Sequence, residues 1–214
     1  MTDKENKEIL SMIFNILIVL LVIVGTIAML TNKDTTTGLT ASGFQNLKFF
    51  TVLSNEFCAI VAVLFLICRK KIKKNMLMLL KLMAAAATGV TFLIIAAFLQ
   101  PLYPDMNLYR AGNLYFHLIV PLVAMTEFIF IGTDEKLPFY CTFISAIPAF
   151  LYGSGYIINI LINGKGEWPD TNDWYGFLNW GWPVGIAIFL FVIVLDWAVA
   201  CLLRFLNKLV GRKR

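Results

Sequence analysis

Short polar segments divide the chain into long apolar stretches. There are six of them, at residues 9–30, 49–68, 76–99, 114–131, 137–161 and 183–206. Each is close to the length that an α-helix needs to cross a bilayer, about 20 residues at about 1.5 Å per residue. Because these stretches take up most of the 214 residues, no separate soluble domain fits between them. We therefore predict an all-α fold, with residues 1–214 forming a single integral membrane domain of six transmembrane helices.

Composition and charge add an orientation to this picture. Hydrophobic residues make up 59% of the chain, and charged residues only 14%. Of the 18 lysine and arginine residues, 14 fall in or next to the two chain ends and the connections at residues 69–75 and 132–136. Since basic residues are enriched on the cytoplasmic side of membrane proteins, we predict that both termini are cytoplasmic. We interpret the basic run at 69–74 as a topology determinant rather than a nucleic-acid site.

No motif for a metal or a cofactor is present. The four cysteines form no Cys-x-x-Cys pair, and they lie in or at the ends of apolar stretches, at Cys58, Cys68, Cys141 and Cys201. There is no ATP-binding loop, no zinc-type histidine cluster and no haem attachment motif. We predict no cofactor, and we interpret the cysteines as small buried side chains.

His117 is the one histidine of the chain, and it lies near one end of the stretch 114–131. Ionisable side chains inside a bilayer are costly and usually face a cavity or a partner. Thr51 lies at the matching end of the stretch 49–68, so alternating helix directions place both residues at one depth. Each belongs to a small or polar stripe at helical spacing. The stripes are Thr51, Ser54, Asn55 and Cys58, and Asn113, His117, Pro121 and Ala124.

This pairing predicts a candidate catalytic site. A threonine hydroxyl becomes a nucleophile when a base removes its proton, and histidine is the usual base near neutral pH. We expect Thr51 to be the nucleophile and His117 the base, provided that hydroxyl and imidazole come within about 3 Å. Glu56 is the candidate for the carboxylate that would complete a triad with Thr51 and His117, although it lies about 140° around the helix from Thr51. The polar residues that would orient the ring or stabilise an oxyanion are Ser54, Asn55 and Asn113.

The same residues allow other interpretations. A threonine in a membrane helix often only bonds to the preceding turn. Further polar side chains fall at this depth, namely Gln100, Tyr152, Ser154, Tyr156 and Asn159. They would line a pocket open to the outer leaflet, or form a ring bonded to one another with no pocket. The tryptophan-rich connection 162–182 is expected to lie along the interface or to fold back over the bundle as a lid.

Two further features concern the interior of the predicted helices. Pro121 and Pro148 lie within spans and leave backbone carbonyl groups without a partner, which neighbouring helices can supply. Nearer the cytoplasmic side, Lys81 and Glu127 fall at one level, so we predict an ion pair between them. We also favour a structural role for the buried Asp196.

Short segments resemble a known family. The sequence FFTVLSN at residues 49–55 is similar to a motif of bacterial six-helix membrane proteins, which resemble the androgen-induced and androgen-dependent transmembrane proteins of animals. The sequence NLYFHLIVPL at 113–122 resembles the histidine motif of that family, and GEWP at 166–169 resembles its counterpart region. The animal members hydrolyse fatty acid esters of hydroxy fatty acids with a threonine and a histidine. The resemblance therefore implies a lipid-ester hydrolase, with Thr51 and His117 in those roles.

The resemblance also limits what can be carried over. Bacterial members more often have a second histidine beside the first and an aspartate near position 127, whereas this chain has Phe116 and Glu127 there. The animal substrate is therefore not assumed. We expect a multi-pass protein of the bacterial plasma membrane whose partners are membrane lipids, with a fatty-acyl ester as substrate. The alternatives are a non-catalytic protein that binds or moves a lipid or small apolar ligand, and an accessory membrane subunit.

Overall fold

The computed structural model describes residues 3–31, 43–105, 107–131, 137–167 and 171–212, and these form helices and connections without strands. Six helical segments are long and apolar enough to cross a membrane, as the apolar stretches predicted. They are Glu5–Thr31, Phe50–Cys68, Lys74–Leu102, Gly112–Ile131, Tyr140–Asn163 and Trp182–Gly211. The predicted connection at 132–136 lies outside the described residues, as do residues 32–42 and Trp168 and Pro169.

Several of the six segments are divided by changes of helical geometry. The first, second and sixth are single helices: α1 (Asp3–Thr31), α2 (Phe50–Cys68) and α9 (Trp182–Arg212). The third consists of α3 (Lys74–Ile94), the π-helix η2 (Ile95–Leu99) and α4 (Gln100–Leu102). The fourth consists of α5 (Gly112–Leu114), the π-helix η3 (Tyr115–Ile119), α6 (Val120–Thr126) and the π-helix η4 (Glu127–Ile131). The fifth is α7 (Tyr140–Ser145) followed by α8 (Ile147–Asn163), and short 3-10 helices lie at η1 (Gly43–Lys48) and η5 (Phe177–Trp180).

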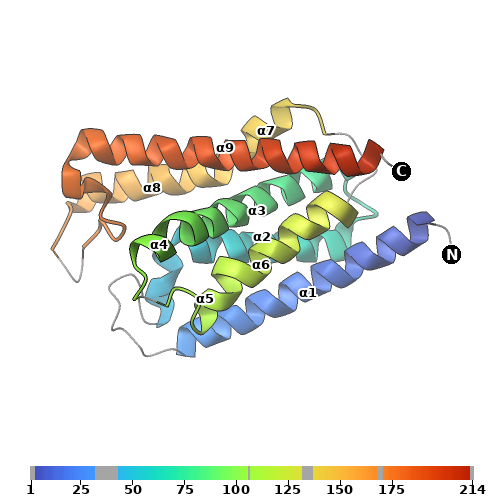
Figure 1. Ribbon diagram of the computed structural model, residues 1–214, viewed down its shortest axis with the longest axis horizontal. Helices are drawn as coiled ribbons and strands as arrows, with labels where there is room; N and C mark the ends of the chain where they lie inside the picture. The colour runs from blue at the N-terminus through green and yellow to red at the C-terminus, as the bar shows by residue number, and fades with distance from the viewer. Residues whose placement is uncertain (1–2, 32–42, 106, 132–136, 168–170, 213–214) are drawn as a thin grey trace.

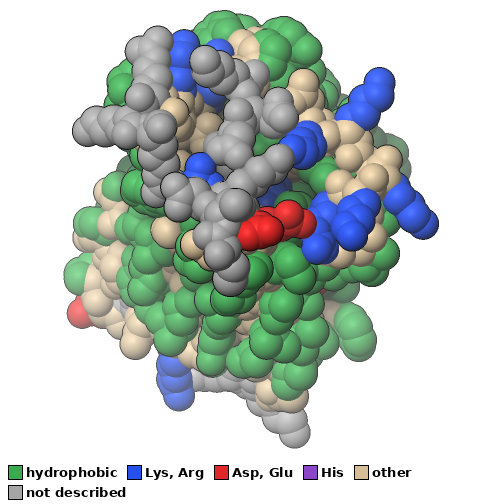
Figure 2. Space-filling view, turned by 90° about the vertical axis from the view of Figure 1, so that its right-hand side faces the viewer, with side chains coloured by type: hydrophobic (Ala, Val, Ile, Leu, Met, Phe, Trp, Pro, Cys, Tyr) green, Lys and Arg blue, Asp and Glu red, His purple; other side chains and the backbone are tan. Residues whose placement is uncertain are grey.

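The helices run antiparallel, so both chain ends lie at the same end of the bundle (Figure 1). We call this the terminal end. The opposite end, which carries η1 and residues 103–105, 107–111, 164–167 and 171–181, is the distal end. Lys and Arg side chains gather at the terminal end, which Figure 2 views directly. Among them, Arg69 pairs with Glu8 at 3.1 Å. That this end faces the cytoplasm stays a prediction.

Helix α3 is the centre of the bundle and packs against α2, α6, α7 and α9. Its middle is a run of small buried residues, Ala84 to Gly89. A side chain at Gly89 would lie within about 3 Å of Val199 and Met125, at 3.0 and 3.1 Å from their nearest atoms. Small residues therefore let α3 and its neighbours approach closely, which is how helices pack without a water-driven collapse.

The predicted Lys81–Glu127 ion pair is present and links α3 to the start of η4. Both side chains are buried, and α1 supplies further polar partners. Ser11 Oγ donates to Glu127 Oε1 at 2.5 Å, Lys81 Nζ donates to Ser11 Oγ at 3.1 Å, and Asn15 Nδ2 lies 3.3 Å from Glu127 Oε1. The Lys81 ammonium also lies 3.7 Å from the centre of the Phe65 ring. The network gives each of the two buried charges, Lys81 and Glu127, a partner. Either charge buried alone would cost several kcal/mol of folding free energy.

Candidate functional site

Thr51 and His117 lie on neighbouring helices near the distal end. Thr51 is in the first turn of α2 and is half-buried, and His117 is in the π-helix η3 and is 7% exposed. One turn after Thr51, the fully buried Asn55 links the two helices. Its Nδ2 donates to the carbonyl oxygen of Thr51 at 2.7 Å and to that of Phe116 at 3.1 Å. One amide group therefore bonds both to the carbonyl oxygen of Thr51 and to that of Phe116, the residue before His117.

Pro121 explains why the Phe116 carbonyl is available to Asn55. In η3 the N–H of Val120 donates to Tyr115 O, five residues earlier, so the helix has a π register here. In that register the donor for Phe116 O would be residue 121, and proline has no N–H. As predicted, a carbonyl group before the proline lacks a donor in its own helix. It is Phe116 O, and Asn55 of the neighbouring helix α2 donates to it. π-Helical turns of this kind are frequent at functional sites.

The His117 ring is oriented by a backbone carbonyl group. Its Nδ1 lies 2.6 Å from Leu108 O, in the connection before α5. A carbonyl oxygen only accepts, so Nδ1 carries the proton, and in the neutral ring the lone pair is on Nε2. Leu108 is itself held in place, because its N–H donates to Gln100 Oε1 at 3.2 Å. Gln100, Leu108 and His117 therefore form a chain of two hydrogen bonds.

The reactive atoms of the predicted pair are not bonded to each other. Among the described residues, neither the Thr51 hydroxyl group nor His117 Nε2 has a hydrogen-bond partner. The buried Oδ1 of Asn55 also has none there. The site thus combines an unengaged hydroxyl group, an unengaged imidazole nitrogen and an unengaged amide oxygen on two helices that Asn55 joins.

The structure gives the predicted supporting residues other partners. Ser54 Oγ donates to Thr51 O at 3.1 Å, and Asn55 likewise bonds to backbone, so Leu108 and not these side chains orients the ring. The Asn113 side chain has no hydrogen-bond partner among the described residues, although its backbone N–H donates to Arg110 O at 3.1 Å at the start of α5. Glu56 accepts a hydrogen bond of 2.5 Å from Thr26 Oγ1 of α1. The group facing His117 Nδ1 is therefore a carbonyl oxygen and not the Glu56 carboxylate.

Tyr152 and Tyr156 of α8 bond to the connection between α8 and α9, which we call the distal connection. The Tyr152 hydroxyl donates to Lys48 O at 2.6 Å and accepts from Trp174 Nε1 at 3.1 Å. The Tyr156 hydroxyl donates to the Asp173 carboxylate. Within the described residues, these two hydroxyl groups bond to the connection and to Lys48 O and not to each other, so they do not form the ring of mutually bonded polar residues that the sequence allowed.

Tyr175 carries this connection to the beginning of α2. Its hydroxyl oxygen accepts the N–H of Phe50 at 2.8 Å, one residue before Thr51. Burial raises the pKa of Tyr175 well above its usual value, so this hydroxyl stays protonated at neutral pH. Residues 173–175 of the connection therefore contact the distal ends of α2 and α8, in keeping with a connection that folds back over the bundle, while its action as a lid stays a prediction.

Sequence reasoning did not identify Gln100, Leu108 and Tyr175 as partners of the site. Gln100 and its depth were noticed, but its bond goes to a backbone N–H in a connection. Leu108 acts through its carbonyl group, which every residue has, so its side chain gives no signal. Tyr175 is one of several aromatic residues in its connection, and only its contact with Phe50 distinguishes it.

No group of three His, Cys, Asp or Glu residues in the described part of the chain could hold a metal ion. Comparisons with protein-family models, with curated proteins and with solved structures found no match. The arrangement of residues at this site is therefore the basis for a functional assignment.

Proposed function

We propose that this protein is an intramembrane lipid-ester hydrolase in which Thr51 is the nucleophile and His117 the general base. The observation that carries the proposal is the position of Asn55, whose amide bonds to Thr51 O and Phe116 O together. These two bonds join the backbone of Thr51 to the backbone beside His117, which supports a site shared by the two adjacent helices. They leave Thr51 Oγ1 and His117 Nε2 without competing partners among the described residues.

The chemistry would proceed through an acyl-threonine intermediate. His117 Nε2 takes the hydroxyl proton as Thr51 Oγ1 bonds to the ester carbonyl carbon. The bond from that carbon to the ester oxygen then breaks, and the alcohol leaves with the proton from Nε2. In the second step, Nε2 takes a proton from water as the water oxygen bonds to the acyl carbon. The bond from that carbon to Thr51 Oγ1 then breaks, Oγ1 takes the proton from Nε2, and the fatty acid leaves.

Two features of the site suit this role. The Nδ1–Leu108 bond keeps the ring in the tautomer whose Nε2 accepts a proton. Catalytic hydrogen bonds are often long in the free enzyme and tighten when substrate binds, so the unbonded pair is compatible with a later proton transfer. The substrate class is an ester of a long-chain acyl group, which would reach the site from the bilayer. We place the protein in the bacterial plasma membrane with cytoplasmic termini, as the sequence predicted.

The test is labelling with a fluorophosphonate probe, which reacts with activated hydroxyl nucleophiles. Thr51→Ala should abolish labelling, and His117→Gln should reduce it by at least about 100-fold, the scale of a general base. The matched control is Thr31→Ala, because Thr31 is an exposed threonine at the distal end of α1 whose hydroxyl group donates, among the described residues, to carbonyl groups of its own helix. Undiminished labelling of Thr51→Ala, in a variant that unfolds at the wild-type temperature, would refute the nucleophile.

A second candidate is a protein that binds a lipid at this site without turnover. It is favoured by the missing bond between Thr51 and His117 in the described structure. This alternative predicts no labelling of the wild-type protein. It also predicts that Thr51→Ala and His117→Gln change the amount of lipid that co-purifies.

A further inference from the structure

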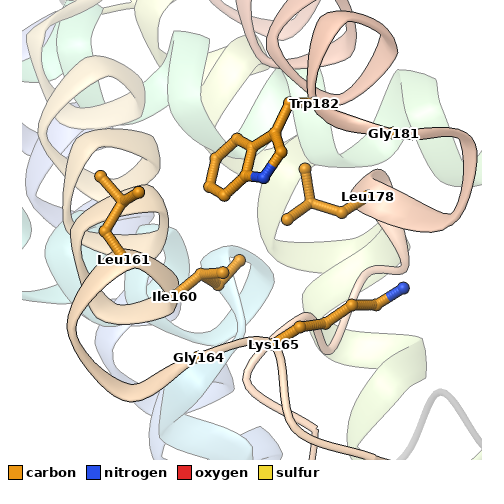
Figure 3. Close-up of a pocket in the computed structure, with 7 residues that line it drawn as sticks. All are labelled: Ile160, Leu161, Gly164, Lys165, Leu178, Gly181 and Trp182. Atoms are coloured by element: carbon orange, nitrogen blue, oxygen red, sulfur yellow. The ribbon is translucent and has the colours of Figure 1, made fainter.

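A cavity of about 300 Å³ lies at the distal end, away from Thr51 and His117. It is bounded by the end of α8, η5 and the start of α9. The lining residues, all drawn in Figure 3, are Ile160, Leu161, Gly164, Lys165, Leu178, Gly181 and Trp182. Its volume is at the lower end of the range for sites that bind small molecules, about 300–1,000 Å³.

The walls of the cavity are apolar and reach the outside of the bundle. Leu161 is 65% exposed and Trp182 is 41% exposed, although both belong to membrane-spanning segments. Exposed leucine on such a helix faces acyl chains, and tryptophan is enriched where the hydrocarbon meets the headgroups. A chain of the surrounding lipid can therefore lie against Leu161 without passing through the bundle.

Two hydrogen-bond donors accompany these apolar walls. The Lys165 side chain runs along the rim, where its ammonium donates to Asn179 Oδ1 at 3.0 Å and lies 3.8 Å from Asp173 Oδ2. It remains 45% exposed, and an ammonium has three donors. Figure 3 shows the Trp182 ring within the cavity, its nitrogen turned to the space between Ile160 and Leu178. That N–H has no partner among the described residues, although indole N–H groups usually find one.

The neighbouring carboxylate positions the lysine. Asp173 is buried, and its oxygens already accept from the Tyr156 hydroxyl and, at 3.0 Å, from the N–H of Leu178. It therefore holds the ammonium at the rim from the protein side. Because the Lys165 side chain is still 45% exposed and its ammonium has three donors, an anion at the rim can bind it as well.

We propose that this cavity binds an anionic phospholipid of the distal leaflet. The phosphate lies at the rim on Lys165, an ester oxygen accepts the Trp182 N–H, and one acyl chain lies along Leu161. A cation at headgroup level beside an apolar wall matches a molecule with a phosphate next to its acyl chains. The site goes beyond the proposed hydrolase activity and uses neither Thr51 nor His117.

The experiment measures lipid binding by native mass spectrometry of the purified full-length protein. The probes are a phosphatidylglycerol and a phosphatidylcholine with identical acyl chains. Phosphatidylglycerol should bind the wild-type protein more tightly than phosphatidylcholine. Lys165→Gln should weaken phosphatidylglycerol binding by about tenfold, the scale of one charge-assisted hydrogen bond, while Lys165→Arg should retain it. Trp182→Phe, which keeps an aromatic ring but removes the N–H, should weaken binding of both lipids by a few-fold.

Lys48→Gln is the matched control, since it also removes a cation from the distal end. The ammonium of Lys48 lies over the Phe49 and Trp174 rings. It should leave phosphatidylglycerol binding unchanged. Equal affinity for the two lipids in the wild-type protein, or undiminished phosphatidylglycerol binding by Lys165→Gln, would overturn the proposal. Fluorophosphonate labelling of Thr51 should persist in Lys165→Gln, so failure of this site and failure of the hydrolase assignment give different results.

Discussion

Asn55 Nδ2 lies 3.1 Å from the carbonyl oxygen of Phe116, and this hydrogen bond joins the helix of Thr51 to the helix of His117. The bond depends on Pro121, which deprives the Phe116 carbonyl of a donor within its own helix. A side chain from one span thus satisfies a backbone defect in another. In lipid, where no water can replace such a donor, this is a strong reason for the two spans to stay in register.

Asn55→Ala should lower the free energy of unfolding, because it leaves the buried Phe116 carbonyl unpaired. The expected loss is about 1–3 kcal/mol. In the Asn55→Ala background, Pro121→Ala should restore part of that stability, since residue 121 then supplies an N–H to its own helix. Thermal unfolding in detergent measures both effects. Additive losses in the double variant would show that Pro121 is not the reason why the Phe116 carbonyl needs Asn55.

The buried pair of Lys81 and Glu127 makes a different prediction. Lys81→Met leaves the Glu127 carboxylate buried without its cation and should cost about 3–5 kcal/mol. The double variant with Glu127→Leu should recover much of this loss, because no isolated charge then remains. Arg69→Gln is the control, since it breaks the more exposed pair with Glu8 and should cost less than about 1 kcal/mol. If Lys81→Met and Arg69→Gln lowered the free energy of unfolding equally, the result would argue against a buried network at Lys81.

Asp196 should behave unlike Glu127. It is fully buried on α9, and neither carboxylate oxygen has a hydrogen-bond partner in the described part of the chain. Asp196→Asn removes no bond and should change stability by less than about 1 kcal/mol, whereas Glu127→Gln should destabilise the protein clearly. Guanidinium or thermal unfolding compares the two variants directly. A large loss for Asp196→Asn would mean that this carboxyl group has a partner in the assembled protein.

Gln100 is a positioning residue, because it acts on His117 through Leu108. Gln100→Leu removes the acceptor for the Leu108 N–H and should slow fluorophosphonate labelling by about tenfold without abolishing it. Gln100→Glu keeps an acceptor oxygen and should restore most of the rate. If Gln100→Leu and Gln100→Glu lowered the labelling rate equally, the Leu108 bond would not be what positions the ring.

Tyr175 should control how firmly the distal connection is attached. Tyr175→Phe removes the acceptor for the Phe50 N–H and should increase protease cleavage within residues 164–181. Tyr103→Phe, at an exposed distal tyrosine, should cause no such increase. Unchanged cleavage of Tyr175→Phe would show that other contacts hold the connection.

The same tyrosine gives a pH dependence. Burial raises the pKa of Tyr175, so the unfolded chain releases this proton before the folded protein does. Stability is therefore full below pH of about 10, the usual tyrosine pKa, and falls as the pH rises above it. Tyr175→Phe should show a smaller fall over that range, measured by thermal unfolding at a series of pH values.

The sequence alone determined the six spans, the shared end of the two termini and the Lys81–Glu127 pair. These follow from hydropathy and from depth along a helix, and both are properties of position along the chain. Only the tertiary structure decided which groups Asn55, Glu56 and His117 contact. Those contacts depend on how each helix is rotated about its axis and on the path of the connections. Their partners include the backbone carbonyl groups of Phe116 and Leu108. Such groups are the same at every residue, so no pattern of side chains indicates which of them a distant helix will bind.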